Sequence, residues 1–407
     1  MNTRRLALIA ATGALLFAAC GSDDSGSKTT ATTAAAATTA ASATTAAAGG
    51  SETTTAADPN APGVGSKKIG FIFVGPKDDY GYNQAAYEGS QAVAKAHPEL
   101  EVLTAENVPQ DDNATRVMED MVAKGAKIIF ATSYGHLDPA LKVAAAHPDV
   151  VVIQQGNFIK DAIPANSGTY FGTVYEPVFL AGIAAGKATK TNKLGYVYAF
   201  PIPQTIANIN AFEFGAKSVN PAAQTYVVNT SNWCDPAKQA DAAKSLIAQG
   251  IDVITQHQDC TATVTKAAEA AGIKVVGYHA DASSLAPKGW LTGSEWNWGP
   301  LYNEIVDTAL AGKFVGSKFN ANYRVGFKDG QNPFVQSKFG PSVDDATKAL
   351  IDTALKLIST TGSPFTGPVM AQDGSELFAA GVVPDYATIE AKNVVFVKGV
   401  VGDIPKG

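Results

Sequence analysis

The chain has 407 residues, of which 46% are hydrophobic and 17% are charged, and its formal net charge is −6. Because the chain is mildly acidic and lacks a basic stripe, we expect no nucleic-acid partner. Its length leaves room for two domains of roughly 150 residues after a low-complexity N-terminal part.

The N-terminus carries a secretory signal. Arg4 and Arg5 precede a short apolar run, residues 6–19, which ends at Cys20. This order resembles the bacterial lipobox, in which cleavage leaves a lipid-modified cysteine as the first residue. The run is shorter than the roughly 20 residues that span a bilayer as a helix. We therefore expect a signal peptide at 1–19 and lipidation of Cys20, with plain secretion or a retained anchor as alternatives.

A low-complexity segment follows the signal. Residues 22–65 are mainly Ala, Thr, Ser and Gly, with almost no large apolar side chain. Such a segment cannot bury enough surface to offset the entropy cost of ordering, so we expect the lipidated cysteine and a flexible linker to cover residues 20–66. A helical or glycosylated segment is the alternative, although Thr and Gly disfavour a helix.

The folded part repeats one rhythm of strands and helices in two halves. A strand, a second strand, an Ala-rich helix and a third strand are predicted at 68–73, 125–130, 142–147 and 150–154, and again at 193–198, 250–254, 266–271 and 274–278. Strands that alternate with helices indicate parallel βαβ units. Because the intervals between these elements match in the two halves, the pattern favours a duplication over a chance similarity. Two such α/β lobes should enclose a cleft at the carboxyl ends of their strands, where ligands of open sheets bind.

Two cysteines lie beside helix starts at that edge of the second half. Asp235 precedes a proline and is placed to cap one helix, and Thr261 can cap the helix after Cys260. Cys234 and Cys260 would then lie at the ends of strands in one sheet, within the roughly 4.4 to 6.8 Å between Cα atoms that a disulfide needs. In an oxidising setting outside the cytoplasm we expect them to be bonded, with two unrelated cysteines as the alternative.

Aromatic, carboxylate and amide side chains gather on the loops of the expected cleft. Rings can stack on the face of a planar ligand while polar groups bind its edge. The alternatives are a surface turn in which Asp79 caps a helix, and tryptophans that simply belong to the core, as also for Trp298. The candidate ligand-binding residues on these loops are Asp79, Tyr82, Asn83, Tyr134, Trp233, His257, Asp259, His279, Asp281 and Trp296.

Signs of catalysis are few. The chain has no G-x-S-x-G, H-E-x-x-H or G-x-G-x-x-G motif. Residues 182–188 look briefly like a phosphate loop, but they follow helical sequence and lack the Ser or Thr after the lysine. His257 and His279 have no Cys or Glu at metal-ligand spacing. We therefore expect neither an enzyme nor a cofactor or metal.

Several of these motifs resemble one known family. Residues 79–89 are similar to the D-x-x-[FY]-N-x-x-x-Y-E-G signature of the basic membrane protein (Bmp) family. That family comprises substrate-binding lipoproteins of ABC importers and includes the purine nucleoside receptor. The likeness covers residues 67–407, and further matches lie at 177–182, 211–216, 364–368 and 397–402.

The resemblance implies a type I periplasmic-binding-protein fold, with two doubly wound parallel-sheet lobes joined by a three-segment hinge. Lobe 1 is expected to be residues 67–174 plus 283–318, and lobe 2 residues 175–282 plus 319–407. It also implies that Tyr82 stacks on a purine whose edge contacts Asp79 and Asn83.

The chain departs from the family's nucleoside receptors in two places. Where those receptors hold ribose with an Asp and a Lys, this chain has His279 and Trp296. Losing charge-assisted hydrogen bonds to the sugar favours a free nucleobase, such as adenine, over a nucleoside. The family's second stacking position corresponds to Asn208, which is added to the candidate site and leaves Trp233 or Trp296 as the second stacking ring.

These features predict an extracytoplasmic, lipid-anchored receptor of an ABC importer that binds a purine as a monomer. Its partners would be an ABC permease and ATPase, with the membrane contacted through the lipid. A sensory ligand-binding lipoprotein and a sugar-binding receptor are the alternatives, and the missing motifs disfavour an extracellular purine-processing enzyme.

Overall fold

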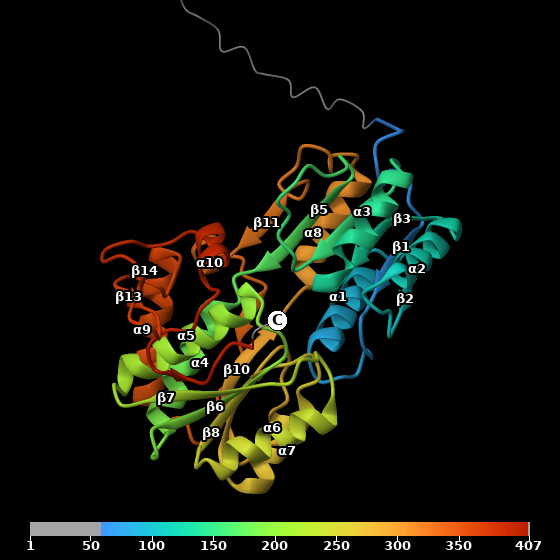
Figure 1. Cartoon of the computed structure of the whole chain (residues 1–407). Helices are drawn as coiled ribbons and strands as arrows, with labels where there is room; N and C mark the ends of the chain where they lie inside the picture. Colours follow the sequence, from blue (N-terminus) through green and yellow to red (C-terminus); the bar gives the residue numbers. More distant parts are fainter. Residues whose placement is uncertain (1–57, 406–407) are drawn as a thin grey trace, which may run out of the picture. The chain divides into compact units, whose positions relative to one another are not determined.

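The computed structural model of the protein describes residues 58–405 (Figure 1). The expected signal peptide, Cys20 and most of the expected linker lie outside the described residues. Residues 58–66 are described, and here the expectation of a flexible linker is wrong. The N–H of Gly63 donates to the carbonyl of Asp149 at 3.0 Å, and Ser66 is buried. Gly63 packs so tightly on Ala309 that a Cβ would lie 2.9 Å from it, a constraint that composition does not reveal.

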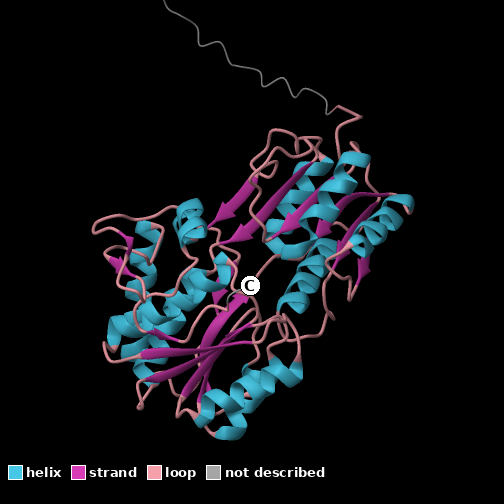
Figure 2. Cartoon of the chain, viewed as in Figure 1, coloured by secondary structure: helices cyan, strands magenta, loops and turns pink. Residues whose placement is uncertain are grey.

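The first sheet has six parallel strands in the order β11-β5-β4-β3-β1-β2. Alternate side chains of its strands enter two cores: Phe71 lies in one and Ile72 in the other. Helices therefore cover both faces, with α1 and α8 on one and α2 and α3 on the other (Figure 2). The elements are β1 (Lys68–Ile72), α1 (Tyr82–Ala96), β2 (Glu101–Ala105), α2 (Asp112–Ala123), β3 (Ala126–Ala131), α3 (Leu137–Ala146), β4 (Val151–Gln155), β5 (Ser167–Gly172), α8 (Gly299–Leu310) and β11 (Asn322–Val325).

The second sheet has seven strands in the order β12-β10-β9-β8-β6-β7-β15, and only β12 runs antiparallel to its neighbour. Helices α4 and α5 cover one face, and α6 and α7 cover the other. The elements are α4 (Tyr175–Ala188), β6 (Lys193–Tyr198), α5 (Pro203–Val219), β7 (Gln224–Asn229), α6 (Pro236–Ala248), β8 (Val253–His257), α7 (Ala262–Ala271), β9 (Lys274–Gly277), β10 (Trp290–Trp296), β12 (Phe334–Gln336), α9 (Asp345–Thr361), β13 (Val369–Met370), β14 (Glu376–Phe378), α10 (Tyr386–Lys392) and β15 (Val400–Val401).

Helix α4 explains the sequence that looks like a phosphate loop. Gly182 faces helix α5, where a Cβ would lie 2.3 Å from the carbonyl of Phe212, and Gly215 of α5 meets the carbonyl of Phe179 in the same way. The glycines are present because the two helix backbones touch. Within the described residues, no helix is long and apolar enough to cross a membrane.

The chain passes between the two sheets three times: from β5 to α4, from β10 to α8, and from β11 to β12. Two of the expected lobe boundaries are therefore wrong. Strand β10 belongs to the second sheet, beside β9, although 283–318 was assigned to lobe 1. Strand β11 belongs to the first sheet, beside β5, although 319–407 was assigned to lobe 2. Leu291 and Thr292 lie within the buried strand β10.

An aromatic stack surrounds the second crossing. The Trp296 ring lies 4.2 Å from the Trp298 ring, with 14° between their planes, and Trp298 stacks in turn on Tyr302 of α8 at 5.6 Å. Phe171, at the end of β5, contacts Trp296 at 4.8 Å. Large buried rings from both sheets thus pack around this passage of the chain.

Glu176 joins the first and third crossings. It lies in the first turn of α4 and is 1% exposed. Its Oε2 accepts hydrogen bonds from the Thr173 hydroxyl, from the Phe327 N–H at 2.8 Å and from the Asn332 side-chain amide at 3.0 Å. Burial outweighs these donors and raises the pKa of Glu176 to about 7.

The buried position of Glu176 predicts a pH dependence of stability. An acid whose pKa is raised on folding stabilises the protein below its unfolded pKa, here 4.5, and this contribution is lost as the pH rises to about 7. Because Gln stays uncharged, Glu176→Gln should gain stability relative to the parent by up to about 3 kcal/mol between pH 5 and pH 8. Urea unfolding at several pH values measures this difference. Glu101→Gln on the surface is the control, and parallel curves for Glu176→Gln and the parent would contradict the prediction.

Candidate ligand-binding site

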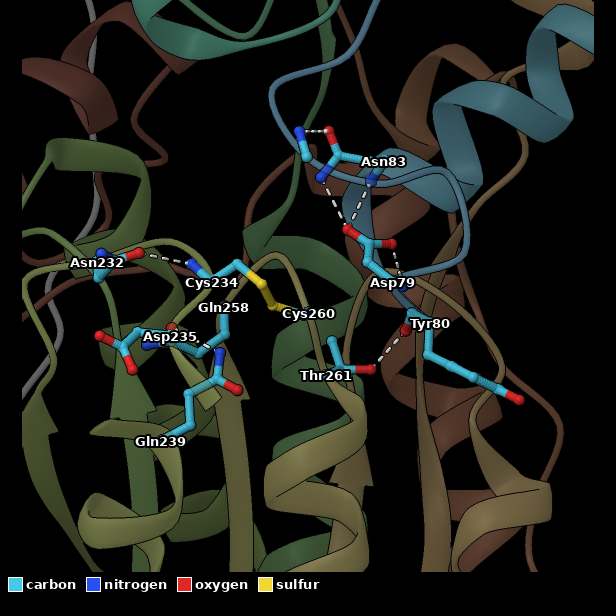
Figure 3. The surroundings of a disulfide bond; sticks show 12 residues. Asp79, Tyr80, Asn83, Asn232, Cys234, Asp235, Gln239, Gln258, Cys260 and Thr261 are labelled. Atoms are coloured by element: carbon cyan, nitrogen blue, oxygen red, sulfur yellow. Dashed lines mark hydrogen bonds between the residues drawn. A yellow bond between two sulfur atoms is a disulfide. The ribbon is translucent and has the colours of Figure 1, made fainter. Parts of the chain in front are cut away.

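Loops at the carboxyl ends of the two sheets touch one another. The N–H of Tyr82, at the start of α1, donates to the carbonyl of Asp259 at 3.0 Å. The hydroxyl of Thr261 donates to the carbonyl of Tyr80 (Figure 3). Gly81 is required here because a Cβ would lie 1.7 Å from the Asp259 carbonyl oxygen. We call these contacts the loop junction. Thr261 does stand at the N-cap of α7, but its hydroxyl serves the junction and not the cap.

Asp79 and Asn83 support the loop junction from inside their own loop. The Asp79 carboxylate accepts the backbone N–H groups of Gly81, Asn83 and Gln84 and the side-chain amide of Asn83. The side-chain oxygen Oδ1 of Asn83 accepts a hydrogen bond from the backbone N–H of Gly75 at 3.0 Å (Figure 3). Both side chains are buried. Asp79 therefore makes the contacts of a helix cap, which is the alternative given in the sequence analysis. Together, Asp79 and Asn83 position Tyr82.

A cavity lies beside the loop junction, between side chains from both sheets. Six of the residues predicted from sequence line it: Tyr82, Tyr134, Trp233, His257, Asp259 and His279. Five more complete the lining, namely Ser133, Gly156, Phe171, Ile202 and Gln204. The Gln204 side-chain amide also donates to the carbonyl of Gly156, which adds another contact between the sheets.

Asp281 does not belong to this cavity. It is exposed, its carboxylate pairs with Lys338 at 2.7 Å, and it accepts the N–H of Ser283. The backbone explains the difference, because His279 adopts a left-handed φ of 70° that redirects the chain after β9. The structure therefore does not place Asp281 with the other predicted site residues, and its side chain closes a surface turn.

Trp296 lies behind the cavity and holds His279. Its indole N–H donates to His279 Nδ1 at 2.8 Å, and its backbone N–H donates to the His279 carbonyl at 3.0 Å. Trp296 is not among the lining residues of the cavity. Burial, with a smaller effect of nearby His257, lowers the pKa of His279 well below its usual range.

Asn208 supports His257 in a similar way. Its side-chain amide donates to the Tyr278 hydroxyl at 2.7 Å and lies 3.1 Å from His257 Nδ1. Burial lowers the pKa of His257 to about 3, so the imidazole is uncharged at neutral pH. Asn208 thus lies beneath the lining and contributes to the site through His257 and Tyr278.

Asp259 is the one acidic residue of the lining. Burial raises the pKa of its carboxyl group well above the usual range, and the nearby Asp79 adds to the effect. Among residues 58–405, no hydrogen bond that would stabilise the charged form reaches this carboxyl group. A buried carboxyl group without a partner is costly, so a bound ligand that supplies hydrogen bonds would be stabilised here.

The cavity combines aromatic faces with a few polar groups. Tyr82, Phe171 and Trp233 supply rings, while Asp259, His257, His279 and Gln204 supply hydrogen-bonding groups. The lining contains no Lys or Arg, and within the described residues no group of three His, Cys, Asp or Glu could hold a metal ion. The arrangement suits a small, flat, uncharged ligand with polar atoms on its edge.

A disulfide joins Cys234 and Cys260, the pair that the sequence analysis expects, with 5.2 Å between their Cα atoms (Figure 3). Asp235 caps α6 as expected, since its carboxylate accepts the N–H of Lys238. The N–H of Asp259 donates to the carbonyl of Trp233 at 2.8 Å. The disulfide and this hydrogen bond therefore join the two loops that carry Trp233 and Asp259 into the cavity lining.

Sequence reasoning missed Phe171 and Gly156 among the lining residues. Both lie at the carboxyl ends of strands of the first sheet, after β4 and in β5. The same rule that identified the loops after β1 and β3 would have included them. Gln204 and Ile202 lie at the start of α5, and neither is an aromatic or charged residue that would mark them as site candidates.

Comparisons with known proteins identify the family of the chain and support the assignment of the fold. A family model, Bmp, described as ABC transporter substrate-binding protein PnrA-like, matches residues 66–363. The chain is 35% identical over 340 residues to a purine-binding protein of Brucella abortus, covering 83% of this chain and 94% of that protein. It is 33% identical over 278 residues to a putative ABC transporter glucose-binding protein of Haloferax volcanii, covering 68% of each.

Solved structures show the same fold. A solute-binding protein of an ABC transporter system from Aeropyrum pernix K1 is similar to this chain with a TM-score of 0.62 at 17% identity, covering 80% of this chain and 98% of that one. This likeness concerns the fold alone. Together with the sheet order, it confirms the predicted two-lobed α/β fold of periplasmic binding proteins.

The Cys234–Cys260 bond should contribute measurably to stability. It closes a loop with a sequence separation of 26, for which the chain-entropy estimate is roughly 3 to 4 kcal/mol. Replacing both cysteines by serine should lower the free energy of unfolding by about that amount, as measured in urea. Adding a reductant should bring the parent to the same value and should leave the double variant unchanged. Equal stability of the oxidised and reduced parent would contradict this.

Proposed function

The chain belongs to the Bmp family of ABC transporter substrate-binding proteins, and we propose that it binds a purine and delivers it to an ABC permease. The cavity beside the loop junction carries this proposal. Its aromatic rings offer faces on which a planar base stacks, and its polar groups lie where they can bind the edge. The similarity to a purine-binding protein over most of both chains supports the same ligand class.

We favour a free nucleobase such as adenine over a nucleoside. The family's nucleoside receptors hold ribose with an Asp and a Lys, and at these positions this chain has His279 and Trp296. His279 lines the cavity and Trp296 lies behind it. Neither supplies the charge-assisted hydrogen bonds that sugar hydroxyls receive in those receptors. A bare base needs partners only along its edge.

In this proposal Tyr82 and Trp233 are the stacking rings from the two sheets. Tyr82 is fixed by the loop junction, and Trp233 is fixed by the disulfide and by the hydrogen bond from Asp259. Asp259, His257 and His279 bind the polar edge. Asp79, Asn83 and Asn208 act through these residues, because the carboxylate of Asp79, the side-chain amide of Asn83 and the amide N–H group of Asn208 contact neighbouring protein atoms.

Sugar binding is the second candidate function, and the Haloferax volcanii relative, described as glucose-binding, favours it. Hexose hydroxyls point in several directions and need many partners. The cavity supplies one carboxyl group and no Lys or Arg, which fits a base better than a hexose. A sensory role would use the same ligand and differ only in the membrane partner.

We also propose that the protein is exported and held at the membrane by a lipid. The signal and the lipobox-like Cys20 support export and a lipid anchor outside the cytoplasm. The linker would give the receptor, as a monomer, reach to a permease coupled to an ATPase. Loss of uptake on deletion of the gene, with signalling unchanged, would separate the transport role from a sensory one.

Ligand identity can be tested by thermal unfolding. The full chain is unfolded and refolded to remove carried-over ligand, then heated with adenine, adenosine, guanine or glucose. A ligand present at 100 times its dissociation constant should add roughly 2.7 kcal/mol to the free energy of unfolding. We expect adenine to raise the midpoint more than adenosine. A shift with glucose alone would refute the purine assignment and support the sugar-binding candidate.

The role of Tyr82 can be tested separately. Replacing it by alanine removes a stacking contribution of about 0.5 to 1.5 kcal/mol beyond area burial, so affinity for adenine should fall at least severalfold. Tyr82→Phe keeps the ring and is the matched control, with an affinity close to that of the parent. Calorimetric titration measures both. Equal affinities of the Ala and Phe variants would remove Tyr82 from the site.

A further inference from the structure

The hydrogen bond between Trp296 and His279 fixes where the imidazole carries its hydrogen. An indole nitrogen can only donate, and it donates here to Nδ1 at 2.8 Å. Nδ1 must therefore offer its lone pair. Neither the imidazolium form, in which both nitrogens carry hydrogen, nor the Nδ1–H tautomer can accept this bond. The single ring hydrogen must lie on Nε2.

The Nε2 atom of His279 is a buried donor without a partner among residues 58–405, on a residue that lines the cavity. His279 is 2% exposed and lines the cavity, and its Nε2 has no hydrogen-bond partner among the residues that the structure describes. A buried donor without a partner destabilises the ligand-free protein. A ligand atom that accepts from Nε2 would relieve this destabilisation on binding.

The backbone of His279 is held in the same orientation. Its φ of 70° is uncommon for a residue with a side chain and persists only where neighbours enforce it. Trp296 helps to hold this backbone conformation, because its backbone N–H donates to the His279 carbonyl at 3.0 Å. On the cavity side, the Tyr82 ring lies 5.0 Å from the His279 ring and restricts the imidazole further.

We propose that His279 is a specificity-determining donor whose hydrogen is fixed on Nε2 by the positioning residue Trp296, and that it selects ligands with a hydrogen-bond acceptor at the facing position. For the purine proposed above, that acceptor is an unprotonated ring nitrogen. The inference rests on the proposed function for the choice of ligand, but its first step, the tautomer, does not depend on any ligand.

The tautomer is measured directly on the full chain by nitrogen NMR of labelled histidine, with His279→Gln used to assign the signal. The parent should show His279 with hydrogen on Nε2. Trp296→Phe, which keeps a ring but removes the donor, should lose this preference. Trp298→Phe is the matched control for a smaller ring in the same aromatic stack: the Nε1 of Trp298 has no hydrogen-bond partner in the described part of the chain, so the variant keeps the donor to His279 and should keep the tautomer of the parent. Hydrogen on Nδ1 in the parent would overturn the proposal, whatever the protein binds.

Selectivity is measured with adenine and its 1-, 3- and 7-deaza analogues, in which one ring nitrogen becomes a C–H group. We expect one analogue to bind the parent about tenfold or more weakly than adenine, because it leaves Nε2 without its acceptor. That ratio should shrink severalfold in Trp296→Phe and approach one in His279→Ala, while Trp298→Phe keeps the ratio of the parent.

The outcomes distinguish a failure of the specificity role of His279 from a failure of the purine assignment. If adenine binds but all three analogues bind equally well, or if the ratio persists in His279→Ala, the specificity role is wrong and the purine assignment stands. If no purine binds and another ligand does, the proposed function is wrong, and the specificity role for purines fails with it. The tautomer measurement then still decides whether Trp296 fixes the hydrogen of His279.

Discussion

The site depends on the close approach of two loops at the carboxyl ends of the two sheets. Gly81 lies against the carbonyl of Asp259 with no room for a Cβ, and the next residue, Tyr82, donates its N–H to the same oxygen. This single contact places the Tyr82 ring beside His279 and brings the Asp259 carboxyl group to the cavity. Asp79 and Asn83 on one side, and the Cys234–Cys260 bond on the other, make each loop rigid enough to keep the contact.

The sequence predicted the architecture well because parallel βαβ units follow local patterns of apolar strands and Ala-rich helices. It failed where a choice depended on packing between distant segments. Residues 283–318 were expected in lobe 1, yet Trp290–Trp296 forms β10 of the second sheet, because its pairing with Val275 and Gly277 extends that sheet before the chain leaves it. No local signal separates a strand that ends a lobe from one that begins the next.

The same limit applied to the candidate site. Residue types on the right loops identified more than half of the cavity lining, including Tyr82, Trp233 and Asp259. Which way each side chain points was not predictable. Asp281 pairs with Lys338 at the surface, and the indole of Trp296 donates a hydrogen bond to His279. The carboxylate of Asp79 accepts N–H groups at the start of α1. Carboxylates cap helices and bind ligands through the same hydrogen bonds, so composition alone could not separate the two roles.

Burial gives the cavity an uncharged character that narrows its ligands. It lowers the pKa of His257 and His279 and raises that of Asp259, so each group favours its neutral form. A charged ligand would lose its hydration without meeting an opposite charge. A sugar is uncharged but carries hydroxyls around its whole ring, more than these few groups can satisfy. A planar base is uncharged, can stack through its faces on the aromatic rings, and carries its polar atoms in its own plane around the rim, where Asp259 and the two imidazoles can bind some of them.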